Sequence, residues 1–143
     1  MGATSSRSSL RSVARTRCVA NIVFDSSVII ALLRGETITH LDLPHLRWAS
    51  MSAVNVAEVF TLLADGNAFA QASGLQTLSL LRTIEPFTAS QARLTGEFRR
   101  FGKNVSLGDR ACMALAVDLG ADIYTADRAW AGFDIGRPIH LIR

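Results

Sequence analysis

The sequence has 143 residues, the length of one ordinary domain, and 49% of them are hydrophobic, which is enough to fill a single core. The longest unbroken apolar run, Ala111–Val117, has seven residues, whereas a membrane-spanning helix needs about 20. Two cysteines and three histidines without a zinc-type spacing argue against a disulfide scaffold, a cysteine-rich zinc module and histidine-based catalysis.

The positive charge is concentrated at the N-terminus. The formal net charge is +3, but residues 1–18 hold four arginines and no acid, so residues 19–143 carry 11 basic and 12 acidic residues. Such a domain would need local features, not bulk charge, to bind nucleic acid. Residues 1–18 are rich in serine and poor in side chains that pack, so we expect a disordered basic extension followed by one domain over residues 19–143. The same composition is typical of an organellar transit peptide.

Strands and helices are predicted to alternate along residues 19–143. The apolar run Val19–Phe24 predicts a buried strand, and Ser26–Leu33 predicts a helix capped by its first serine. Residues 36–47 are ambiguous, because Pro44 limits any helix there. The remaining predicted elements are a short strand over Arg47–Met51, a helix over Ala53–Ala64 capped by Ser52, a helix over Asn67–Arg82, an extended segment over Thr83–Pro86, a helix from a Thr88 capping box to about Phe101, a helix from a Ser106 capping box to Leu119, and strands over Asp122–Ala126 and Ile139–Ile142. This alternation predicts an α/β layered domain with a mostly parallel sheet.

Two aspartates directly follow predicted strands. Asp25 comes after the first strand and Asp127 after the strand that begins at Asp122. In open parallel sheets the carboxyl ends of the strands meet at one edge, which is where functional sites lie. An aspartate at a strand-to-helix turn is also typical of a helix cap or an Asx turn, so each residue alone has two interpretations.

Two further acids lie on predicted helices. Asp109 falls in the first turn of its helix, where the positive helix dipole keeps a carboxylate ionised and suited to a hard divalent cation, although the Ser106-x-x-Asp109 pattern is equally a capping box. Glu58 forms a polar stripe with Asn55 and Thr61 on an otherwise apolar helix. The stripe either faces solvent or directs a carboxylate toward the sheet edge. Glu58 lies about 9 Å along the helix from its start, and this distance favours an indirect role over direct metal ligation.

Four segments occur in a fixed order between about residues 22 and 143: IVFDSSVIIALL, SAVNVAEVF, SLGDRACMALA and YTADRAW. Together they resemble the PIN-domain ribonucleases, and more narrowly the VapC-type toxins of toxin–antitoxin pairs. The resemblance implies a PIN-like three-layer α/β/α fold with a short, mostly parallel central sheet. Residues 1–18 are not part of the family pattern, and residues 35–47 look short and irregular where such toxins carry a clearer helix.

The four acids of the family pattern fall on Asp25, Glu58, Asp109 and Asp127. The resemblance implies that they form one catalytic site, in which the three aspartates ligate metal and Glu58 orients water or a ligand. Carboxylates gathered without cations would raise one another's pKa, and oxygen-only ligands favour Mg²⁺ or Mn²⁺. The supporting residues implied are Ser26 and Thr125 for hydroxyl contacts to the ligands, and Arg110 and Arg128 for contacts to substrate.

The resemblance implies a metal-dependent endoribonuclease that hydrolyses RNA phosphodiester bonds with a water activated by the cation. It also implies a cytoplasmic toxin of a type II toxin–antitoxin pair, a homodimer, and a VapB-type antitoxin bound over helices 26–33 and 52–64. A phospho-acceptor receiver would need paired acids after the first strand and a lysine after the last, and the sole lysine is Lys103. A non-catalytic RNA-binding or scaffold module on the same fold remains the alternative.

Overall fold

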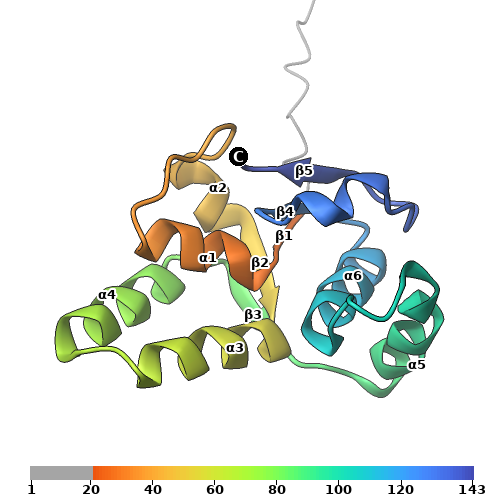
Figure 1. Ribbon diagram of the computed structural model, residues 1–143, viewed down its shortest axis with the longest axis horizontal. Coiled ribbons are helices and arrows are strands. Elements are labelled where there is room, and N and C mark those ends of the chain that lie inside the picture. The colour runs from red at the N-terminus through yellow and green to blue at the C-terminus, as the bar shows by residue number, and fades with distance from the viewer. Residues whose placement is uncertain (1–20) are drawn as a thin grey trace, which may run out of the picture.

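The predicted strands assemble into a single sheet with helices on both of its faces (Figure 1). The structure is a computed structural model that describes residues 21–143; the expected disordered extension over residues 1–18 and the start of the strand predicted from Val19 lie outside the described residues. The strands are all parallel and lie in the order β3-β2-β1-β4-β5. Their bounds are Ile22–Phe24 (β1), Ala49–Ser52 (β2), Thr83–Glu85 (β3), Asp122–Thr125 (β4) and Ile139–Leu141 (β5).

The helices form the two outer layers of a three-layer α/β/α fold. Helices α1 to α4 pack on one side of the sheet, and α5 and α6 pack on the other (Figure 1). None of the helices in the described part of the chain is long and apolar enough to span a membrane. Their bounds are Ser26–Leu33 (α1), Leu43–Trp48 (α2), Ala53–Ala64 (α3), Ala68–Ser79 (α4), Ala89–Glu97 (α5) and Leu107–Leu119 (α6), with short 3₁₀ helices over Phe98–Phe101 (η1) and Arg128–Gly132 (η2).

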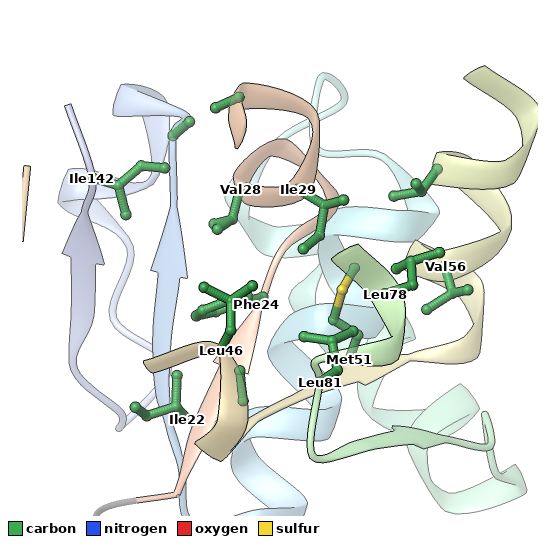
Figure 2. Close-up of a cluster of buried hydrophobic side chains, with 14 of the residues drawn as sticks. Ile22, Phe24, Val28, Ile29, Leu46, Met51, Val56, Leu78, Leu81 and Ile142 are labelled. Carbon is green, nitrogen blue, oxygen red and sulfur yellow. The ribbon is translucent and has the colours of Figure 1, made fainter. Parts of the chain in front are cut away.

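The two faces of the sheet have separate hydrophobic cores, because successive side chains of a strand point to opposite faces. Phe24 packs with Val28 and Ile29 of α1 on the first face, as Figure 2 shows. Val23, the neighbour of Phe24 in β1, packs on the second face with the buried side chains of α6. The apolar run Ala111–Val117 is therefore explained by α6, which lies between the sheet and α5 and is buried on most sides along this run.

Helix ends follow the predicted signals with two corrections. The capping box at Ser106 is present, and α6 ends at Gly120, which has the left-handed φ of 58°. Thr88 caps α5 by accepting a hydrogen bond from the Gln91 backbone, but the reciprocal bond of a capping box is absent, so that prediction was half right. Ser26 does not cap α1: it is the first helical residue, and Asp25 occupies the N-cap position without a side-chain capping bond.

The ambiguous segment before β2 contains a helix that the sequence analysis did not predict. Pro44 does not prevent α2, because it lies in the first turn, where a missing N–H breaks no intrahelical bond. The Asp42 side chain accepts a hydrogen bond from the backbone of His45, whose ring contacts the Asp42 backbone in return. Helix α2 takes up the first two residues of the strand predicted over Arg47–Met51, so β2 begins at Ala49.

Candidate active site

Asp25 is the most buried carboxylate at the carboxyl edge of the sheet. It follows β1, donates its backbone N–H to the Tyr124 carbonyl of the neighbouring β4 (3.1 Å), and is only 3% exposed. Its Oδ2 accepts hydrogen bonds from Ser27 Oγ (2.7 Å) and Thr125 Oγ1 (3.2 Å). Each of these hydroxyls accepts a backbone N–H in turn, Ser27 from Ala126 and Thr125 from Asp127. Their protons are therefore directed at Asp25, and this network fixes Oδ2 as an acceptor.

The other carboxylate oxygen of Asp25 has no partner. Oδ1 is buried and makes no hydrogen bond among the described residues. Burial is the main cause that raises the pKa of Asp25 from 3.8 to about 6; the Ser27 and Thr125 bonds oppose the rise, and the nearby carboxylates Asp109 and Glu58 add to it. An anionic oxygen that is buried and unpaired, with like charges nearby, is the arrangement that a bound cation would stabilise.

The hydroxyl beside Asp25 belongs to Ser27 and not to Ser26. The sequence analysis assigned a supporting role to Ser26, which is buried at the start of α1 but makes no side-chain hydrogen bond within residues 21–143. Ser27 contacts Asp25 and the backbone of Ala126, so it ties α1 to the end of β4. Thr125 is in the predicted position.

Asp109 satisfies both interpretations offered by the sequence. Its Oδ2 accepts the Ser106 backbone N–H (3.0 Å), while Ser106 Oγ accepts the Asp109 N–H (3.1 Å), which completes the capping box. The same carboxylate is half-buried, and burial is the main cause that raises its pKa; the Ser106 bonds lower it, Asp127 raises it and Arg110 lowers it. The cap holds this acid at the helix N-terminus facing the other carboxylates.

Glu58 is exposed to solvent, but its carboxylate lies against α6. Its Oε1 accepts a hydrogen bond from Asn55 Nδ2 (3.0 Å), and its carboxylate packs on Gly108 in the first turn of α6. Partial burial raises the pKa of Glu58, the Asn55 bond lowers it, and Asp109 raises it. The polar stripe on α3 is therefore divided: Asn55 is fully buried, whereas Thr61 is exposed and bonds only within its own helix.

Asp127 and the two predicted substrate arginines lie at the rim. Asp127 is exposed and caps η2 through the Ala129 N–H (2.9 Å). Arg128 is exposed beside it in a hollow that also contains Ser27 and Arg143. Arg110 is bound elsewhere, because its guanidinium donates to the backbone carbonyls of α5 and of the α6 cap. Arg128 is thus accessible to a phosphate, and Arg110 holds α5 against α6.

The carboxylates share one electrostatic environment centred on the start of α6. Cys112, fully buried one turn after Gly108, has its thiol pKa raised mainly by burial and further by Asp25, Asp109 and Glu58. Across residues 21–143 no three carboxylate, imidazole or thiol groups already lie close enough to ligate one cation. The donors available are all oxygens, and Asp127 is an exposed side chain that can change rotamer, so the set suits a hard divalent cation.

Three residues of this site were not identified as site members from the sequence: Ser27, Asn55 and Gly108. The motif Asp25-Ser-Ser offered two hydroxyls without a signal to choose between them. Asn55 was noticed only as part of the polar stripe. The absence of a side chain at Gly108 matters only once α3 and α6 are packed together, and no local pattern predicts that contact.

Comparison with solved structures finds the same fold in chains from toxin–antitoxin complexes. A chain of the VapBC2 complex from Rickettsia felis, bound to a promoter DNA fragment, superposes with a TM-score of 0.67 at 18% identity, covering 85% of this chain and 98% of that one. VapBC-5 from Mycobacterium tuberculosis gives 0.59 at 24% identity, covering 86% and 98%. VapC20 from M. tuberculosis, described as a toxin that cleaves the sarcin–ricin loop, gives 0.59 at 25% identity, covering 82% and 99%.

Comparison of the sequence itself gives the family. No curated protein sequence matches this one, but the PIN-domain family model matches residues 22–135, which run from the start of β1 to beyond η2. That range contains all four predicted acids, the two hydroxyls that contact Asp25, and four of the five strands. The architecture and the sequence match agree, and this chain belongs to the PIN-domain family.

Proposed function

We propose that this protein is a metal-dependent endoribonuclease and the toxin of a type II toxin–antitoxin pair. The observation that carries the proposal is the buried Asp25 carboxylate, which lies beside the acids Asp109 and Glu58. Two hydroxyls hold one of its oxygens, and the other oxygen has no partner in the described part of the chain. A protein that used these acids only as helix caps would have no reason to bury an unpaired carboxylate oxygen at the sheet edge.

The cofactor we propose is Mg²⁺ or Mn²⁺. Asp25, Asp109 and Asp127 would hold it, since each offers a carboxylate at the same edge of the sheet. When bound, such a cation would acidify a water molecule and neutralise charge on the scissile phosphate. The chain's own residues orient the ligands: Ser27 and Thr125 fix Asp25, and the Ser106 cap fixes Asp109. Glu58 lies close enough to Asp109 for that acid to raise its pKa, and its carboxylate would accept a proton or orient water.

RNA is the substrate we propose. The guanidinium of Arg128 is exposed beside Asp127, in the hollow that also contains Arg143, and arginine suits a phosphate oxygen because it donates in pairs. The folded part carries no excess of basic residues, so binding would depend on such local contacts. VapC20, a structural neighbour at 25% identity, is described as cleaving an RNA loop, which supports a structured RNA whose loop exposes a reachable backbone.

A VapB-type antitoxin is the partner we propose. A groove of about 410 Å³ lies between α1, α3 and α4 and is lined by Leu33, Leu62 and Phe69, of which Phe69 is 81% exposed. Both of the predicted antitoxin-binding helices, over residues 26–33 and 52–64, contribute to it. The neighbours VapBC2 and VapBC-5 are toxin–antitoxin complexes, which supports a partner of this class. We also propose a homodimer that acts in the cytoplasm.

The decisive test is cleavage of a labelled RNA hairpin by the full chain with Mg²⁺, Mn²⁺ or EDTA. We expect turnover with either cation, none in EDTA, and none for Asp25→Asn, which keeps the size and hydrogen-bonding oxygen but removes the charge. Asp118→Asn is the matched control, because Asp118 is an exposed acid at the far end of α6. Turnover in EDTA, or by Asp25→Asn, would remove the metal mechanism; RNA and cation binding without cleavage would favour the non-catalytic module.

The partner is tested separately by co-expression with the product of the adjacent reading frame. We expect one complex on size-exclusion chromatography, with cleavage suppressed until the antitoxin is removed. A toxin that stays free and active beside that product would contradict the antitoxin proposal without affecting the nuclease. Light scattering of the isolated chain gives its oligomeric state, and a monomer at micromolar concentration would contradict the homodimer.

A further inference from the structure

Asn55 is an unusual side chain for its position in α3. It is fully buried where α3 meets α6, on a helix whose other buried residues are the apolar Val56, Val59 and Leu63. Its Nδ2 donates two hydrogen bonds of 3.0 Å each, one to Glu58 Oε1 in its own helix and one to the Gly108 carbonyl in α6. A single buried amide therefore connects one of the predicted acids to the first turn of the helix that carries another, Asp109.

Gly108 provides a second, independent observation at the same contact. A Cβ built on Gly108 would lie 2.1 Å from Glu58 Oε1 and 2.6 Å from its Cδ, far inside van der Waals contact. The space that any other residue would fill at this position is occupied by the Glu58 carboxylate. A glycine within a helix lowers helix stability relative to alanine, so the fold gains nothing here except room for that carboxylate.

Burying the Asn55 amide lowers the stability of the folded state, and packing between α3 and α6 does not require an amide there. Both N–H groups of the Asn55 amide are used, and within residues 21–143 its buried Oδ1 has no partner, which destabilises the folded state. The Gly108 carbonyl lies in the first turn of α6, where carbonyls already accept the intrahelical bond, so it does not require the amide. An apolar side chain at residue 55 would pack between the helices without an unmet acceptor.

We propose that Asn55 is a positioning residue for Glu58. The Asn55 amide holds Glu58 Oε1 against the start of α6, in the space left by Gly108, and leaves Oε2 available to the site that contains Asp109. This rests on the proposed nuclease function. Across the described chain, Glu58 Oε2 accepts no hydrogen bond, so it is available to orient water or a ligand. The proximity of the two acids agrees with this, because Asp109 raises the pKa of Glu58.

The competing explanation is that Asn55 only joins α3 to α6. A structural tie would affect folding, and its loss would change activity by the same factor whether or not Glu58 is present. A positioning residue acts through Glu58 alone. The two explanations are separated by a double-mutant cycle, in which the effects of two residues that act as one unit do not multiply.

The experiment measures RNA cleavage and the Mg²⁺-induced rise in melting temperature for the full chain and four variants. They are Asn55→Ala, Glu58→Ala, the double variant, and Thr61→Ala as control, since Thr61 is an exposed polar residue of α3 that bonds only within its helix. We expect Asn55→Ala to lower turnover by about 10- to 100-fold, raise the Mg²⁺ concentration for half-maximal activity, and keep its cooperative unfolding. The double variant should be no slower than Glu58→Ala, and Thr61→Ala should match the parent.

The outcomes separate this inference from the function on which it rests. If the parent neither cleaves RNA nor gains stability with Mg²⁺, the proposed function fails and this inference fails with it. If the parent does both, but Asn55→Ala has parental turnover and Mg²⁺ dependence, only the positioning role is overturned. An Asn55→Ala effect of equal size in the Glu58→Ala background would also overturn it, in favour of a structural tie. Gly108→Ala adds a check that leaves Asn55 unchanged: it should displace Glu58 and give the same non-additive loss.

Discussion

Replacing Asp25 with asparagine should stabilise the metal-free protein at neutral pH. The pKa of Asp25 rises from 3.8 to about 6 on folding, mainly because the carboxyl is buried. Between pH 3.8 and about pH 6, the folded state therefore holds a proton that the unfolded chain has lost, and the free energy of unfolding falls as the pH rises through this range. Because one pKa unit corresponds to about 1.4 kcal/mol, ionised Asp25 lowers the free energy of unfolding by about 3 kcal/mol above pH 6. Asparagine resembles the protonated acid and avoids this loss.

The assay is urea unfolding in EDTA at fixed ionic strength from pH 4 to pH 8. We expect the stability difference between Asp25→Asn and the parent to be small at pH 4 and to reach about 3 kcal/mol by pH 7, because only the parent ionises at this position. Asp118→Asn should follow the parent, since Asp118 is exposed. The reasoning would be refuted if the Asp25→Asn and parent curves ran parallel across this range.

Two further predictions follow from the contacts of the site, and a third concerns residues 1–18. Asp109→Asn should melt higher than the parent in EDTA at pH 7.5 and lose most of the Mg²⁺-induced stabilisation. If Asp109 only capped the helix, the substitution would instead lower the free energy of unfolding by about 0.3–1 kcal/mol and leave the response to Mg²⁺ unchanged. Ser27→Ala should lower the free energy of unfolding by about 1 kcal/mol because it breaks the bond to the Ala126 backbone, while Ser26→Ala should stay within about 0.5 kcal/mol in urea unfolding, and equal losses would contradict the assignment. Removing residues 1–18 should leave unfolding and turnover at saturating RNA unchanged and weaken RNA retention only at low salt in filter binding; loss of turnover would give the extension a catalytic role.

Much of the fold could be predicted because residues next to each element mark where that element begins and ends. Helix α6 begins at a serine whose hydroxyl caps it and ends at Gly120, and both signals are written in adjacent residues. The sequence does not predict α2, because proline disfavours the interior of a helix, whereas Pro44 lies in the first turn, where proline is compatible with the helix. The evidence for α2 was also local, in the reciprocal contact of Asp42 with His45, but histidine is not the usual partner in a capping box.

The site was predictable only as far as it depends on strand ends. Asp25 and Thr125 end adjacent parallel strands, so the topology alone brings them together. The choice of Ser27 over Ser26 depends on the rotation of α1 relative to β4, which no residue near the two serines determines. Asn55 and Gly108 are 53 residues apart, and their contact follows from how two helices pack after the sheet has formed.

Cys112 gives this protein an internal reporter. Its thiol is fully buried beneath the acids and its pKa is well above the ordinary value, so it holds its proton and does not react while α6 lies against the sheet. With Cys18 replaced by serine, a thiol-reactive dye would label only molecules in which that contact has opened, and the labelling rate would count those openings. Cation or partner binding at the acidic edge could then be followed as slower labelling of a residue that neither of them touches.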